Sequence, residues 1–147
     1  MDDIEQIKEK YLGHQFETKE FEVNAEVLAE CARACGEIAP RFTDPAHADF
    51  QATPTWVSSL ARGRNLPQDF PMFGGVGFDG GKDVTPYKAV RPGAKLTGHT
   101  HVHDIYAKTG RSGRMIFVVS RMELFDDNGD KVADADTRLV IKESKTS

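Results

Sequence analysis

Residues 96–142 read LTGHTHVHDIYAKTGRSGRMIFVVSRMELFDDNGDKVADADTRLVIK, and this stretch decides the fold. It contains three runs rich in β-branched and aromatic residues, which favour strands. A glycine-containing loop at residues 109–113 separates the first two runs, and Asn128-Gly129, a strong hairpin signal, separates the last two. The stretch therefore predicts an antiparallel meander with strands over residues 96–108, 114–126 and 131–142.

Two more strands are predicted upstream of the meander. Residues 16–23 alternate between apolar and polar or charged side chains, as a half-buried strand does. Residues 82–90 form a strand between turns at residues 79–81 and 91–93. The glycine-rich residues 74–77 lack the Lys-Ser/Thr pair of a phosphate-binding loop, so we interpret them as a bend into a strand.

Helical spacing marks three segments. Residues 1–11 form a short amphipathic helix. A second helix begins after the N-cap Asn24 and ends at Gly36. The third, residues 54–62, begins with Thr53 as cap and Pro54 at its first position. We expect this third helix to be the most buried element, with Val57 and Leu60 in the core, and at most one helical turn, at residues 45–48, in the connection before it.

The two cysteines lie on the second helix. Cys31 and Cys35 are one turn apart, among the apolar positions of that helix. A disulfide there is sterically awkward, and a metal pair lacks a second pair of cysteines. We interpret both as small buried residues.

Composition is that of one soluble domain. The chain has 147 residues, 39% hydrophobic and 29% charged, with a net charge of −4. No basic stripe points to nucleic acid, and no apolar run is long enough to cross a membrane. The acidic start, Met1 to Glu5, does not resemble a secretory signal, so we expect a cytoplasmic protein. A sheet wrapped around one central helix, of the α+β class, buries these elements most simply.

The chain resembles the N-terminal type of MaoC-like dehydratase domain. Stretches at residues 16–36, 41–55, 79–93 and 104–119 carry this resemblance in order, and it extends from about Gly13 to Lys142. The resemblance implies a hot-dog fold over residues 1–147, with 12–143 as the domain proper. It also implies hydration of enoyl thioesters, or dehydration of 3-hydroxyacyl thioesters, of coenzyme A or acyl carrier protein, usually with R stereochemistry. Such a protein works in fatty acid or steroid metabolism without a cofactor or metal.

Family members use an Asp and a His in a Gly-Asp-x-Asn-Pro-x-His pattern, which positions a water and moves its proton. A backbone amide at the start of the central helix stabilises the enolate oxygen. The matching stretch here is residues 36–42, GEIAPRF. Glu37 replaces the Asp and Phe42 replaces the His, and a phenyl ring cannot take a proton. The catalytic pair is therefore not intact.

Family pairs exist in which one subunit keeps the motif and the other helps to shape the acyl tunnel. We expect this chain to be the second kind, pairing as a heterodimer with a catalytic hot-dog subunit or as a homodimer. The expected substrate-binding residues are Thr55 and Trp56, beside the tunnel, and Arg111 and Arg114, whose charges suit phosphates.

Two alternatives remain open from the sequence. A homodimeric hydratase would use Glu37 with His47, or with a histidine from the strand carrying His99, His101 and His103. A non-catalytic module would bind the acyl thioester without turning it over. The three alternating histidines share one face of their strand, and we expect that face to be solvent-exposed rather than a metal site.

Overall fold

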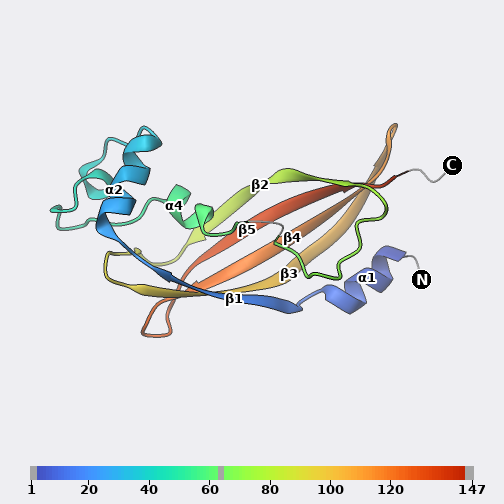
Figure 1. The fold of residues 1–147 in the computed structure, drawn as a ribbon, viewed down its shortest axis with the longest axis horizontal. Helices are drawn as coiled ribbons and strands as arrows, with labels where there is room; N and C mark the ends of the chain where they lie inside the picture. Colours follow the sequence, from blue (N-terminus) through green and yellow to red (C-terminus); the bar gives the residue numbers. More distant parts are fainter. Residues whose placement is uncertain (1–2, 63–64, 145–147) are drawn as a thin grey trace.

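The computed structural model describes residues 3–62 and 65–144, and an antiparallel sheet dominates it (Figure 1). The sheet has five strands in the order β1-β3-β4-β5-β2. The predicted meander is confirmed, since β3 pairs with β4 and β4 with β5. The strands are β1 (Gln15–Glu22), β2 (Val76–Pro86), β3 (Lys95–Gly110), β4 (Gly113–Phe125) and β5 (Lys131–Lys142).

Strand β2 differs from its prediction. It begins at Val76 and runs through Asp79, Gly80 and Gly81, where the register with β5 shifts, instead of turning there. Asp79 Oδ1 accepts from Gly81 N at 2.8 Å, and Gly81 has a φ of +106°, which favours glycine. The glycines therefore form a bulge inside a strand. Because β2 pairs with β5 rather than β3, β1 and β2 are the two edges of the sheet.

Four helices accompany the sheet: α1 (Asp3–Tyr11), α2 (Ala25–Ala34), α3 (Pro40–Thr43) and α4 (Pro54–Ser59). Residues 1–2 of the predicted first helix lie outside the described residues. Asn24 caps α2 as predicted, since its side chain accepts from Glu26 N and Val27 N. The helical turn expected at residues 45–48 lies instead in α3.

The buried face of α2 is rotated from the predicted one. Leu28, Ala29 and Ala32 are buried, whereas Val27 is 49% exposed. Both cysteines are free; Cys31 is half-buried and Cys35 is exposed. The interpretation of Cys35 as a buried residue is therefore wrong, because it stands at the C-cap, where the helix leaves the core.

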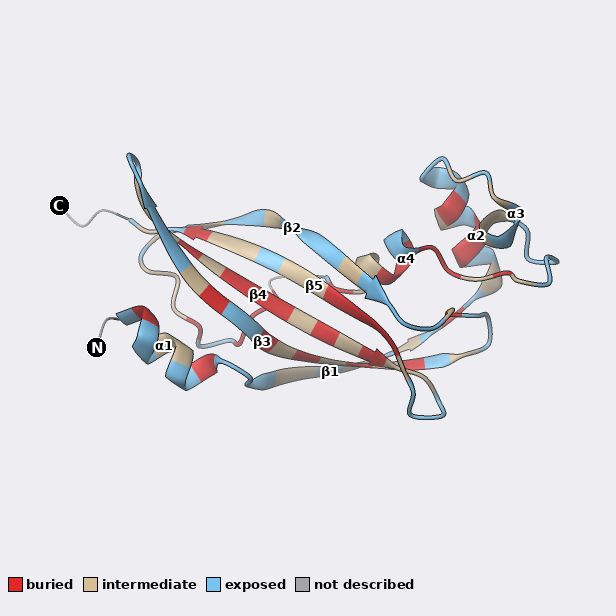
Figure 2. Cartoon of the chain, turned by 180° about the vertical axis from the view of Figure 1, so that it is seen from behind, coloured by how far each residue is buried: buried red, intermediate tan, exposed pale blue. Residues whose placement is uncertain are grey.

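The central helix is much shorter than expected. It has six residues, and only Trp56 and Val57 are buried within it. Leu60 follows the helix and is half-buried against the core. Strands β4 and β5 carry more buried residues than this helix (Figure 2), so the prediction that it is the most buried element is wrong, as is its predicted length, although Val57 is in the core as predicted. Residues 65–75 cross the sheet without helical structure.

One face of the sheet, here called the inner face, carries the core in two clusters. The first lies under α2 and α4 and includes Met122 and Leu124. The second lies under α1 and residues 66–73 and includes Ile116 and Val118. These four residues alternate along β4, so both clusters occupy the same face. None of the described helices is long and apolar enough to cross a membrane.

Candidate functional site

A pocket of about 280 Å³ lies between α4, the connection before it and the edge strand β2. Its walls are largely apolar and come from residues far apart in the sequence. Phe42 comes from α3, Pro54 and Val57 come from α4, and Val84 comes from β2. The pairing of β2 with β5 brings Ala133 into the same wall. An apolar, concave site of this kind suits an acyl chain.

Phe42 brings an aromatic ring to the position expected for the catalytic His. Pro40 starts the short helix α3, and Phe42 follows on its first turn. The ring is half-buried in the wall of the pocket, and the Arg41 guanidinium lies over it, with its central carbon 4.7 Å from the ring centroid. The ring offers no proton-transfer group, so this wall contributes shape and apolar contact.

The Glu37 carboxylate is hydrogen-bonded to the backbone of the two residues that follow it. Its Oε1 accepts from Ile38 N at 3.0 Å and from Ala39 N at 3.1 Å. Gly36 precedes it with a φ of +81°, so the chain turns sharply at this point. Glu37 does not line the pocket. The two residues that the sequence resemblance aligns with the acid–base pair are therefore a structural carboxylate and an apolar ring.

The start of α4 is built as predicted, but its side chains differ in role. Thr53 Oγ1 accepts from Trp56 N at 3.1 Å and caps the helix. Trp56 is 7% exposed and packs in the core, and Thr55 is exposed; neither lines the pocket. Pro54 and Val57 line it instead. Of the two residues on α4 that were predicted to contact substrate, Trp56 is thus a core residue and Thr55 is exposed outside the pocket.

Arg111 and Arg114 lie away from this pocket, in the β3–β4 hairpin at the opposite end of the sheet from α4 (Figure 1). Arg114 donates to Asp3 at 2.8 and 2.7 Å and to Glu143 at 2.8 Å through each of two nitrogens. These bonds raise its pKa above the ordinary range and tie α1 to the end of β5. Arg114 is therefore structural, whereas Arg111 is exposed.

The histidines weighed as substitute bases do not meet Glu37. His47 Nδ1 accepts from Asp49 N at 3.0 Å within an exposed turn. His99 contacts Gln15 and Thr18 of β1 on the outer face. His47 and His99 do not line the pocket, and neither do His101 and His103. In residues 3–62 and 65–144, no three His, Cys, Asp or Glu side chains converge as a metal site.

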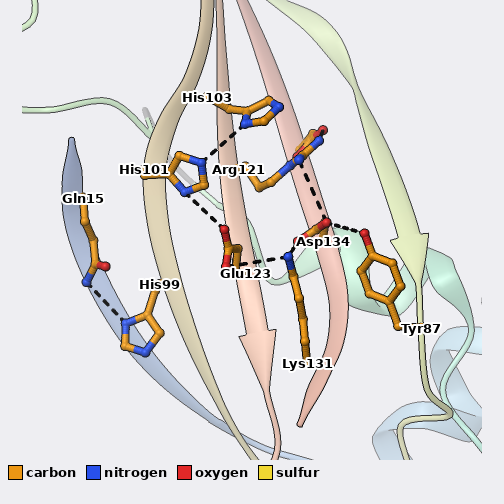
Figure 3. A network of polar contacts seen from close by, with 10 residues as sticks. Gln15, Tyr87, His99, His101, His103, Arg121, Glu123, Lys131 and Asp134 are labelled. Carbon is orange, nitrogen blue, oxygen red and sulfur yellow. Dashed lines mark hydrogen bonds and ion pairs between the residues drawn. The ribbon is translucent and has the colours of Figure 1, made fainter. Parts of the chain in front are cut away.

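The outer face carries a polar network that the sequence did not reveal (Figure 3). Asp134 is 3% exposed and accepts from Tyr87 Oη at 2.6 Å, and Lys131 Nζ lies 2.7 Å from its other oxygen. Burial acts to raise the pKa of Asp134, but Lys131 and Tyr87 outweigh burial and hold it below its usual value. His101 lies at the other end, 3.8 Å from Glu123, and burial lowers its pKa. The predicted exposure of this histidine is only partly correct, because the network half-buries it.

The pocket residues on β2 and directly after it were also not predicted from the sequence. Val84 and Tyr87 become part of the site only because β2 pairs with β5. The signal available in the sequence was the alternation of Asp134 and Asp136 with Ala133 and Ala135. It marks β5 as a strand with two very different faces.

The comparisons with known proteins agree with this geometry. The family model described as "FAS1-like, dehydratase domain region" matches residues 10–135. No curated protein sequence matches the chain. The C-terminally truncated HadBC (3R-hydroxyacyl-ACP dehydratase) complex of Mycobacterium tuberculosis is 26% identical, with a TM-score of 0.67, covering 88% of this chain and 96% of that one.

Two more solved structures share the fold. The ChsH1-ChsH2 complex of Mycobacterium tuberculosis is 17% identical, covers 98% of this chain and 91% of that one, and gives a TM-score of 0.69. A MaoC-like dehydratase of Rhodospirillum rubrum is 18% identical, covers 92% and 94%, and gives a TM-score of 0.61. The chain therefore belongs to the FAS1-like dehydratase region family and has the hot-dog fold of the MaoC-like hydratases and dehydratases.

Proposed function

We propose that this chain is the non-catalytic subunit of a heteromeric hydratase or dehydratase that acts on acyl thioesters of coenzyme A or acyl carrier protein in the cytoplasm. The observation that supports the proposal most strongly is Phe42, whose ring lines the pocket where the family places its catalytic His. Glu37, bound to its own backbone, supplies no substitute. The chain would hold part of the acyl chain while a partner supplies the acid–base pair.

The edge strand β2 is the proposed contact with that partner. Val76 is 63% exposed and Phe78 is 55% exposed on this edge. The other edge, β1, carries Glu17, Lys19, Glu20 and Glu22, and charges on an edge discourage pairing. Pro86 and Tyr87, both exposed, line the pocket at the end of β2. A partner strand added to β2 would cover Val76 and Phe78 together with the exposed pocket residues Pro86 and Tyr87.

Antiparallel pairing along β2 would also give Arg111 a role. The start of β2 aligns with the end of β5, beside the β3–β4 hairpin, and its end lies at the pocket. Such pairing would bring the hairpin end of this chain to the pocket end of its partner. Arg111 would then contact the phosphates of a thioester bound in the partner's site.

Activity assays on purified proteins test the proposal. The chain alone should not hydrate a crotonyl or decenoyl thioester, because general acid–base catalysis, typically ~10²–10⁴-fold, is missing. Adding a motif-bearing hot-dog subunit should produce activity above that of the partner alone. Turnover by the chain alone at an ordinary rate of ~1–10³ s⁻¹ would show that the non-catalytic assignment is wrong.

A pocket-filling variant links this stimulation to the pocket. Ala89 lines the pocket, so Ala89→Trp should lower kcat/KM of the complex for a decenoyl thioester by at least about 10-fold, as loss of a hydrophobic pocket does. Ala107→Trp, at an exposed position of β3, is the matched control and should leave kcat/KM unchanged. Equal effects of the two variants would mean that the pocket does not bind the acyl chain. If the chain binds the thioester but stimulates no partner, the remaining assignment is a non-catalytic binding module.

A further inference from the structure

A row of polar side chains interrupts the inner face of the sheet. Lys82 of β2 pairs with Thr137 of β5, and Thr137 pairs with Ser120 of β4. Along β4, Ser120 lies between Val118 of one core cluster and Met122 of the other. The row therefore crosses the core at the boundary between its two apolar clusters.

Backbone groups of the connection after α4 converge on this row. Ser120 Oγ donates to Asn65 O at 2.6 Å and holds this segment against β4. Asn65 is 8% exposed and has a φ of +54°. At the other end, Lys82 Nζ donates to Ala61 O at 2.6 Å and to Ser58 O at 3.4 Å. These contacts account for Ser120 and for two of the three donors of the Lys82 ammonium.

Two polar atoms, one in the row and one in the connection held against it, have no such account. Asn65 Nδ2 and Thr137 Oγ1 are buried, and neither has a hydrogen-bond partner within the described part of the chain. Nearly all buried polar groups in folded proteins are paired, because leaving one unpaired costs free energy. Holding the segment does not require them, since Ser120 already does so. Their presence points to a polar group that is not part of this chain.

The chemistry of the open positions defines that group. The Asn65 amide nitrogen can only donate, and the Thr137 hydroxyl can donate or accept. An oxygen that accepts hydrogen bonds, such as a ketone or hydroxyl oxygen, satisfies both. On β2, Lys82 at one end of the row is two residues, about 7 Å along the strand, from Val84 in the pocket wall.

We propose that Asn65 and Thr137 form a hydrogen-bonding subsite for an oxygen carried on the acyl chain, remote from the thioester. This inference rests on the proposed function, and it makes the preferred ligand an oxygenated acyl thioester rather than a plain alkyl one. The thioester end lies toward Phe42, and the chain extends along α4 to the polar row.

Calorimetric binding to the complex of this chain with its partner tests the subsite. The probes are dodecanoyl-coenzyme A and a positional series of oxododecanoyl-coenzyme A thioesters. One positional isomer should bind about 3- to 10-fold more tightly than the unsubstituted thioester, the gain from one or two buried hydrogen bonds. Thr137→Val should abolish that preference, and Asn65→Leu should do the same independently if Thr137→Val impairs folding. Thr109→Val, an exposed position on β3, is the matched control and should retain it.

The outcomes separate the two proposals. If all thioesters bind with equal affinity, or if the preference survives both substitutions, the subsite is overturned and the two atoms serve internal water alone. If no thioester binds, the acyl pocket and the subsite are both overturned. A preserved preference without any stimulation of the partner's activity supports the subsite and overturns only the catalytic-partner role.

Discussion

At the scale of single residues, the hydroxyls of Ser120 and Thr137 on the inner face are expected to affect the free energy of unfolding in opposite directions. Ser120 Oγ makes a 2.6 Å bond to Asn65 O, whereas Thr137 Oγ1 has no partner within the described residues. Ser120→Ala should therefore lower the free energy of unfolding by about 1–3 kcal/mol, since it leaves a buried carbonyl unpaired. Thr137→Val keeps the shape and removes an unpaired group, so it should be neutral or stabilising.

Urea unfolding of the two variants at neutral pH measures the difference. A loss above about 2 kcal/mol for Thr137→Val would show that its hydroxyl is bonded in the folded protein. That result would remove the basis for the oxygen subsite.

Asp134 gives a second test at the residue scale. Its pKa is held below the usual value, because Lys131 and Tyr87 favour the carboxylate more than burial opposes it. A carboxyl whose folded pKa is depressed stabilises the protein above its unfolded pKa, about 4, and loses that contribution as pH falls through the folded value. Asp134→Asn should therefore destabilise the protein at neutral pH.

The deficit of Asp134→Asn should begin to shrink as pH falls below about 4, and it should be lost once pH is below the lower folded pKa, where the folded carboxyl is protonated. Thermal unfolding of both proteins across this pH range measures it. Asp127→Asn is the matched control for the removal of one carboxylate, because Asp127 is exposed on the β4–β5 turn. A loss of stability in Asp134→Asn that does not change with pH would mean that ionisation of the Asp134 carboxyl does not stabilise the folded protein.

At the scale of elements, local pattern predicted which segments are strands better than it predicted which strands pair. The run after the Asn128-Gly129 hairpin signal predicted β5 with its observed bounds, Lys131–Lys142. No local pattern distinguishes β3 from β5 as the neighbour of β2, because that choice depends on the chain crossing from one edge to the other. The pocket wall at Val84 and Tyr87 follows from that crossing, so the sequence did not reveal it.

Helix α4 shows a different limit of sequence reasoning. Trp56, Val57, Leu60 and Ala61 have helical spacing, yet the helix ends at Ser59. The Lys82 ammonium binds the carbonyls of Ser58 and Ala61, a tertiary contact that no periodicity reports. The absence of a proton-transfer group at position 42, by contrast, follows from residue type alone, because a phenyl ring cannot transfer a proton in any fold.

The shorter α4 changes the expected cost of substitutions along it. Val57 is 4% exposed, so Val57→Ala should cost about 1–3 kcal/mol. Leu60 lies beyond the helix and is half-buried, so Leu60→Ala should cost less than the about 2–5 kcal/mol of a fully buried leucine. We expect Leu60→Ala to cost no more free energy of unfolding than Val57→Ala, and guanidinium unfolding of both variants measures the two losses. A larger loss for Leu60→Ala than for Val57→Ala would indicate that the central helix extends through Leu60.

At the scale of the whole molecule, the exposed edge β2 is the proposed contact through which the chain assembles. An unpaired apolar edge favours association, and pairing it with another strand covers Val76 and Phe78. Phe78→Asp places a charge in that contact. It should abolish dimer formation, with itself or with a hot-dog partner, while changing the stability of the chain by no more than about 0.5 kcal/mol, because Phe78 is exposed.

Light scattering at micromolar concentration, with and without candidate partners, measures this assembly. Glu20→Lys is the matched control, since it changes charge at an exposed position on the opposite edge, β1, and should leave the dimer intact. If Glu20→Lys disrupts the dimer and Phe78→Asp does not, the interface lies at β1, away from the pocket. A parent chain that stays monomeric with every partner would overturn the proposed shared site, because no second subunit would then cover the exposed pocket residues Pro86 and Tyr87.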